Sequence, residues 1–219
     1  MRYRCITMTA TDRAYAFAKE RILDGRFAGG ELISEGDVAA GVELSRTPVR
    51  EAFLRLEAEG LLRLYPKRGA LVVAVSADEV EHVMETRLLV ERFSIEKIVR
   101  AGTDLGDVPA SLIAEQAAHA ERGDAPAFVD ADRRFHRTYV AAAGNPLLLQ
   151  LHDSLRDRQS RMGLAALAAD ADRVQQILAE HRALAAAVAD GDGDAAREIV
   201  DRHLHGTFAL LRGPGRALG

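Results

Sequence analysis

The sequence predicts a mainly α-helical protein, with an N-terminal winged helix-turn-helix followed by a C-terminal all-helical antiparallel bundle. Three observations predict this fold class. A short capped helix near residue 50 carries two arginines on one face, and two apolar runs joined by a basic turn follow it. After Ser76 the chain reads as a series of helices punctuated by glycines. We therefore expect one domain at residues 9–76, a second at residues 77–212 and a tail at residues 213–219.

The segment Ser45-Arg46-Thr47-Pro48-Val49-Arg50-Glu51-Ala52 is the strongest signal in the chain. Ser45 can accept a hydrogen bond from a backbone N–H at the start of a helix, and Pro48 is tolerated in the first helical turn. Arg46 and Arg50 are four residues apart and therefore share one helix face. Another face carries the apolar residues Val49, Ala52, Phe53 and Leu56. A recognition helix has this layout, because its N-terminal residues meet base edges in the major groove of DNA.

The elements on either side of this helix complete a DNA-binding plan. Residues 35–40 are predicted to form a short helix that Gly41 ends, so the helix-turn-helix spans about Glu35 to Leu54. Residues 61–65 and 70–75 are predicted to be strands, and the turn between them is Pro66-Lys67-Arg68-Gly69. A basic hairpin after a recognition helix is a wing, which can lie against DNA phosphates.

Charge is divided unevenly between the two predicted domains. The net charge of the 219 residues is −4 at pH 7. Residues 1–76 hold 12 basic and 10 acidic residues, whereas residues 77–219 hold 17 and 23, so the first domain is mildly basic. No apolar run approaches the ~20 residues of a membrane span, and we expect no signal peptide and no membrane partner. The single cysteine, Cys5, allows no internal disulfide and fits the cytoplasm, where we expect the protein.

Residues 77–211 are expected to be entirely helical. Ser76 and Glu79 form a capping box that opens a long helix. Helix formers, start signals and glycine stops then predict six helices, at about 77–101, 109–122, 125–142, 146–168, 171–189 and 194–211.

Four residues of metal-ligating type lie on three of these helices. Asp132 and His136 are four residues apart on one helix face, and His181 and His203 lie on two later helices. Three imidazoles and one carboxylate suit zinc, nickel or manganese if the helices converge. From spacing alone, hydrogen-bonded core histidines are the alternative. Three further histidines stand near charged residues and are expected to be exposed, namely His82, His119 and His152.

The first domain resembles the winged-helix domain of GntR-family bacterial transcription regulators. The resemblance covers roughly residues 12–76 and rests on Ser34-Glu35, residues 45–52, Leu56, Glu59-Gly60-Leu61 and Arg68-Gly69-Ala70. It implies that operator DNA is contacted by Arg46, Thr47, Arg50 and Gly69. One departure is Gly36-Asp37, where the family often has a basic residue.

The second domain resembles the FCD effector domain of the FadR subfamily of GntR regulators, and six helices match its shorter, VanR-like type. The features are Arg87 and Glu91, Asp132 with Phe135-His136, Gly144-Asn145-Pro146, Glu180-His181, Gly191-Asp192 with Ala195-Ala196, and His203-Leu204. The resemblance implies a divalent metal, zinc before nickel or manganese, held by Asp132, His136, His181 and His203. It also implies a small carboxylate effector beside the ion, paired with Arg87. The alternative for Arg87 is an ion pair with Glu91 on the same helix face.

The predicted function is a ligand-responsive transcription repressor, not an enzyme, that binds a near-palindromic operator as a homodimer. One alternative is a metal-dependent hydrolase, although the sequence contains no HExxH-type motif. Another is a zinc-stabilised interaction module fused to a DNA-binding domain. A structural ion of that kind would resist chelation and would not respond to small acids.

Overall fold

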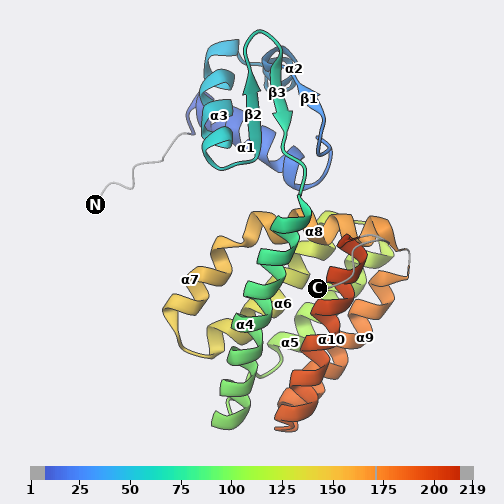
Figure 1. Cartoon of the computed structure of the whole chain (residues 1–219). Helices are drawn as coiled ribbons and strands as arrows, with labels where there is room; N and C mark the ends of the chain where they lie inside the picture. Colours follow the sequence, from blue (N-terminus) through green and yellow to red (C-terminus); the bar gives the residue numbers. More distant parts are fainter. Residues whose placement is uncertain (1–7, 171, 213–219) are drawn as a thin grey trace. The chain divides into compact units, whose positions relative to one another are not determined.

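The computed structural model describes residues 8–170 and 172–212 (Figure 1). Contacts divide the chain into two compact units, with the boundary between Val75 and Ser76. The predicted tail at residues 213–219 lies outside the described residues. Within the described residues, no helix is long and apolar enough to cross a lipid bilayer.

The first unit contains three helices and a small antiparallel sheet. Its elements are α1 (Ala10–Leu23), β1 (Leu32–Ile33), α2 (Glu35–Val42), α3 (Arg46–Ala58), β2 (Leu62–Tyr65) and β3 (Gly69–Val72). The sheet order is β1-β3-β2, and Ala70 of β3 pairs with both Ile33 and Leu64. Val49, Ala52, Phe53 and Leu56 are fully buried, as the recognition-helix pattern predicted. The winged helix-turn-helix prediction is therefore confirmed as a fold.

Three local details of this unit differ from the sequence-based expectation. Ser45 occupies the N-cap of α3, but its side chain makes no capping hydrogen bond. Helix α2 continues to Val42 and ends where Glu43 adopts a left-handed conformation, with φ 54°. Gly41 does not end the helix. It packs against the ring of Phe17, and a Cβ at this position would lie only 2.5 Å from the ring's Cζ atom.

Strand β1 was not predicted, because two residues are too few for an alternating pattern. Its pairing with β3 explains the glycine at the start of that strand. A Cβ on Gly69 would lie 2.3 Å from the carbonyl oxygen of Ile33, and Gly69 has φ 102°. Glycine is therefore required at position 69 for both close approach and backbone conformation.

The second unit is a bundle of helices, shown with α4 and α10 side by side in Figure 1. Its helices are α4 (Ala77–Ala101), α5 (Val108–Glu121), α6 (Ala125–Ala142), α7 (Pro146–Ser154), α8 (Arg156–Ala169), α9 (Arg173–Ala189) and α10 (Gly193–Arg212). Helix α4 begins at the predicted cap, where Ser76 accepts a hydrogen bond from the backbone N–H of Glu79. The bounds of α4 and α6 match the prediction.

The helix predicted at residues 146–168 is in fact two helices, so the described bundle has seven helices and not six. The break is at Leu155, whose backbone N–H bonds to the carbonyl of His152, three residues back. Helix α7 packs against α4 and α6, whereas α8 packs against α6 and α10. No proline or glycine marks this position, so the sequence carries no local signal for the break.

An uncommon number of polar side chains lies inside this bundle. Among the described residues, those less than 10% exposed include Arg87, Glu91, Gln116, His136, His152, Arg173, His181 and His203. Charged and imidazole groups are rarely buried to this extent without partners. Their positions define the candidate site.

Candidate metal centre and DNA-binding face

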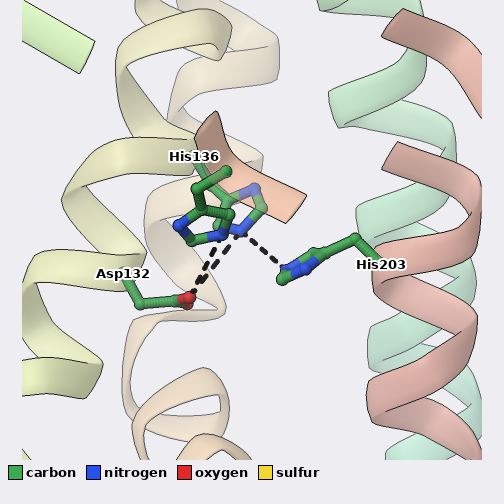
Figure 2. Close-up of side chains that lie close together, drawn as sticks. Asp132, His136 and His203 are labelled. Atoms are coloured by element: carbon green, nitrogen blue, oxygen red, sulfur yellow. Dashed lines mark hydrogen bonds and ion pairs between the residues drawn. The ribbon is translucent and has the colours of Figure 1, made fainter. Parts of the chain in front are cut away.

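Asp132 and His136 from α6, His181 from α9 and His203 from α10 converge in the middle of the bundle. One ligand atom from each residue lies within 4.8 Å of the others. Figure 2 shows Asp132, His136 and His203 directed toward one another. The Nε2 atoms of His136 and His203 are 3.1 Å apart, and Nε2 of His181 is 3.5 Å from Oδ1 of Asp132. The structure thus brings together all four residues that the sequence selected as metal ligands.

Each of the three histidines has an oxygen beside its other ring nitrogen, as an ion pair at His136 and as a hydrogen bond at His181 and His203. The Nδ1 contacts are 2.7 Å from His136 to Glu91 Oε2, 2.9 Å from His181 to Gln116 Oε1, and 2.7 Å from His203 to Glu180 Oε2. An Nδ1–H that donates to an oxygen leaves the lone pair on Nε2, which is then free to accept a hydrogen bond or to bind a metal. Metal-binding histidines are commonly oriented in this way by a carboxylate or carbonyl partner.

The pKa values of two of these imidazoles, His181 and His203, are lowered, which favours the neutral form that binds metals. Burial lowers the pKa of His181 well below its usual value, and the nearby His203 and His136 lower it further. Burial also lowers the pKa of His203, and the hydrogen bond that its Nδ1 makes to the Glu180 carboxylate acts in the opposite direction. Nε2 of His181 is buried and has no hydrogen-bond partner among the described residues. Converging imidazole nitrogens beside a carboxylate fit a divalent cation of borderline softness.

Glu91 joins the metal centre to Arg87. Arg87 Nε lies 2.7 Å from Glu91 Oε1, and both side chains are buried. The structure therefore contains the ion pair that was the alternative reading of Arg87. Burial alone would raise the pKa of Glu91, but Arg87 and His136 hold it well below its usual value. The Arg87 side chain also lines a cavity beside Asp132 and His203, so the ion pair does not remove it from that space.

His152 was predicted to be exposed, and that prediction is wrong. Its side chain is 1% exposed on α7, with Nε2 3.6 Å from Glu91 Oε1. The residues near it in sequence are charged, whereas its burial depends on a carboxylate 61 positions earlier. His82 is exposed and His119 is half-buried.

Sequence reasoning missed the residues that support the ligands. Gln116 and Glu180 each hold a ligand imidazole, and Glu180 holds His203 although it is adjacent to His181. Arg173 is 2% exposed and donates to the backbone carbonyl of His203 at 3.0 Å. Arg173 Nη1 is also 3.2 Å from Glu180 Oε2. An arginine at the first position of a helix is usually exposed, so no sequence pattern indicates this arrangement.

The residues predicted to read DNA lie on one face of the first unit. Arg46, Thr47 and Arg50 are exposed at the start of α3. Arg46 and Arg50 line a groove together with the wing residues Lys67, Arg68 and Gly69. A Cβ on Gly36 would lie 3.5 Å from Nη2 of Arg46, so the Arg46 guanidinium lies beside the position where a basic residue was expected.

Comparison with known families decides the identity of both units. Residues 10–72 match the family described as bacterial regulatory proteins, gntR family, and residues 82–206 match the FCD domain. The chain belongs to the GntR family. It is a DNA-binding transcription regulator with an FCD domain, and the comparisons group it with transcriptional repressors, not with enzymes.

Relatives of this GntR-family regulator match most of its length. It is 28% identical to the gluconate operon transcriptional repressor of Bacillus licheniformis, over 88% of this chain and 79% of the relative. It is 26% identical to the galactonate operon transcriptional repressor of Escherichia coli K12, over 88% of this chain and 93% of the relative. A structure described as a putative GntR transcriptional regulator from Rhodococcus sp. RHA1 matches with a TM-score of 0.77 and 25% identity. The match covers 94% of this chain and 99% of that structure's chain.

Proposed function

We propose that this regulator is a repressor whose helical domain binds one divalent metal ion and a small organic acid. The observation that carries the proposal is the arrangement of three buried histidines. Each has its Nδ1 held by an oxygen, and the three Nε2 atoms converge with the Asp132 carboxylate. We expect it to act in the cytoplasm, where bacterial operator DNA is found.

Asp132, His136, His181 and His203 would hold the ion, with zinc the first candidate and nickel or manganese next. When bound, the ion would supply a Lewis-acid anchor for a carboxylate oxygen of the effector. Arg87 lines the adjacent cavity and offers a second anchor, since a guanidinium can pair with a carboxylate through two hydrogen bonds. Two relatives named as repressors of sugar-acid operons support an acid as the class of effector.

Elemental analysis of the purified full chain tests the metal part of this proposal. We expect about one ion per chain, as for a site in which four protein ligands converge. A chain that binds no metal, even after incubation with zinc, would reject it. A melting temperature unchanged by both chelation and small acids would instead favour the zinc-stabilised interaction module.

For DNA reading we propose Arg46, Thr47 and Arg50 of α3, together with the wing at Gly69. Replacing Arg50 by alanine should weaken specific operator binding by roughly 1–3 kcal/mol, the usual worth of a bidentate arginine–guanine contact. The measurement is a fluorescence-anisotropy titration of operator DNA at fixed salt. Arg26→Ala is the control, because it removes one positive charge from the loop after α1. Equal losses in the two variants would mean that Arg50 contributes charge and not base recognition.

We also propose that the regulator is a homodimer that joins through α4 and α7. These two helices pack against one another and carry four exposed apolar side chains. Their exposed fractions are 71% for Leu89, 49% for Phe93, 73% for Leu147 and 41% for Leu151. Exposed apolar side chains on neighbouring helices support an interface there, and a two-fold dimer matches a palindromic operator.

Phe93→Glu should convert the dimer to a monomer, because a carboxylate would replace an aromatic ring in the joined surfaces. Sedimentation velocity on the full chain measures this change. The control is Val108→Glu, which alters an apolar residue of α5 that is 50% exposed. A dimer that persists in Phe93→Glu would place the interface elsewhere on the chain.

A further inference from the structure

The side chain of Arg173 lies in the seam between α9 and α10, almost entirely out of contact with solvent. It is 2% exposed, although Arg173 is the first residue of α9. Its Nη2 donates a hydrogen bond to the backbone carbonyl of His203 at 3.0 Å and another to Oγ1 of Thr207 at 2.8 Å, both on α10. Arginine is almost never fully buried unless it is paired, so these contacts are the physical basis of its position.

The same guanidinium also reaches the carboxylate beside the His203 ring. Nη1 of Arg173 is 3.2 Å from Oε2 of Glu180, and that oxygen is 2.7 Å from Nδ1 of His203. Glu180 lies seven residues beyond Arg173, about two turns along the same face of α9. His203 is therefore held from two directions, at its backbone carbonyl by Arg173 and at its ring by Glu180. Both of these contacts involve one arginine.

Gly206 of α10 leaves the space that the Arg173 guanidinium occupies. A Cβ on Gly206 would lie 3.5 Å from Nη1 of Arg173 and 3.7 Å from its Cζ. These are ordinary contact distances, so the guanidinium lies directly against the backbone of α10 at this glycine. A larger side chain that points in this direction would need the space of the guanidinium.

A second arginine, carboxylate and histidine are arranged in the same way at His136. The Glu91 carboxylate is 2.7 Å from Nδ1 of His136 and 2.7 Å from Nε of the buried Arg87. At His181 the supporting oxygen belongs instead to a neutral amide, which needs no opposite charge. Each supporting carboxylate of the centre is thus fixed and compensated by a buried arginine.

From these contacts we propose that Arg173 is a positioning residue of the metal centre, on which the affinity of the centre for zinc depends. It acts through His203 and Glu180, because it restricts the backbone of the first and the carboxylate of the second. The His203 ring then has one orientation before an ion binds, and less conformational freedom is lost on binding. This inference rests on the proposed function, since it requires His203 to be a ligand. The alternative is that Arg173 only joins α9 to α10.

The test measures zinc affinity on the full chain by competition with a chromophoric chelator. Arg173→Met keeps an unbranched apolar stem and removes the guanidinium, and it should lower the affinity roughly 10- to 100-fold, as is usual for loss of a residue that orients a ligand. Arg197→Met is the control, because it breaks a surface ion pair with Asp194 on α10 and should leave the affinity unchanged. Equal affinities in these two variants would overturn the inference.

Lysine at the same position separates charge from geometry. Arg173→Lys keeps the positive charge but lacks the planar fork that bonds to α10 and to Glu180 together. Its zinc affinity should lie between those of Arg173→Met and the wild type. A wild-type affinity in Arg173→Lys would overturn the positioning role, since charge alone would then suffice.

A second pair of variants leaves Arg173 itself in place, because Arg173→Met could alter folding. Gly206→Val should displace the guanidinium, since a β-branched side chain has few conformations in a helix with which to avoid it. We expect a loss of zinc affinity similar to that in Arg173→Met. Ala209→Val, at an exposed position of α10, is the control and should bind zinc as the wild type does. Equal affinities in Gly206→Val and Ala209→Val would contradict the role given to the seam.

Cobalt(II) in place of zinc provides a readout that a purely structural role would not change. Its visible absorption bands depend on the geometry of its ligands, so Arg173→Met should alter the spectrum and Arg197→Met should not. A lower melting temperature in Arg173→Met, with zinc affinity and cobalt spectrum unchanged, would mean that Arg173 only joins the two helices. If the wild-type chain itself bound no zinc by elemental analysis, the proposed metal site would fall and this inference with it.

Discussion

Replacing His203 by alanine is expected to remove stoichiometric metal from the protein. The Nε2 of His203 faces the three other ligand side chains, and its loss leaves three ligands in the centre. Loss of a residue that merely orients a ligand commonly costs 10- to 100-fold in metal affinity, and loss of a ligand itself should cost more. We therefore expect at least a 100-fold lower zinc affinity, measured by competition with a chromophoric chelator.

The chain provides a matched control on the same helix. His205 is two residues beyond His203 on α10 and is exposed. His205→Ala removes an imidazole of the same type and should retain the wild-type affinity for zinc. Equal affinity in the two alanine variants would reject the assignment of His203 as a ligand. Because His203→Ala could alter folding, Glu180→Gln serves as a milder variant, and an intermediate loss of about 10- to 100-fold is expected for it.

The second large effect is expected at Glu91, where substitution should destabilise the fold. Glu91→Gln removes the charge that compensates the buried Arg87 and weakens the hold on His136. Leaving one partner of a buried ion pair unpaired commonly costs about 3–5 kcal/mol in the free energy of unfolding. In a chain of this length, the melting temperature of the metal-free protein should fall by roughly 6–20 °C.

Acid titration gives this prediction a second measurement. The pKa of Glu91 is held well below its usual value in the folded protein, so its charge stabilises the fold at pH values above the unfolded pKa of about 4.3. That contribution is lost as the pH falls from about 4.3 toward the folded pKa. Glu91→Gln should lack this part of the acid dependence.

Two variants act as controls for Glu91→Gln. Glu115→Gln breaks an exposed ion pair with Arg134 and should cost less than about 1 kcal/mol. Adding Arg87→Met to Glu91→Gln removes the unpaired buried charge and should restore part of the lost stability. If Glu115→Gln were as destabilising as Glu91→Gln, burial of the Arg87 pair would not be the cause.

Local rules located several helix ends correctly, although they failed at Gly41 and at the side chain of Ser45. The Ser76 N-cap and Gly102 mark both ends of α4, and Asp124 likewise caps α6. The four candidate ligands were selected by residue type and by resemblance to a family, and the helices bring them together. Their role as ligands stays a prediction until metal is measured.

Features that depend on distant partners were not predictable in this way. His152 is buried with its Nε2 3.6 Å from Glu91, and Arg173 is buried with a hydrogen bond to the His203 carbonyl on α10. Strand β1 exists only through its pairing with β3, and two residues carry no periodicity of their own. The break at Leu155 reflects the different neighbours of α7 and α8, which a local sequence pattern does not encode.

Strand β1 has a consequence for how the first unit meets DNA. It ends at Ile33, and the next residue, Ser34, is the N-cap of α2, so the pairing of β1 with β3 ties the wing to the helix-turn-helix. A wing attached only at its own base would lose conformational freedom when it settled on DNA, and that loss would subtract from affinity. In this chain the pairing of β1 with β3 orders the base of the wing when the first unit folds, before any DNA is bound. If α3 and the wing both contact DNA, as proposed, this pairing reduces the conformational entropy that the wing would lose on binding.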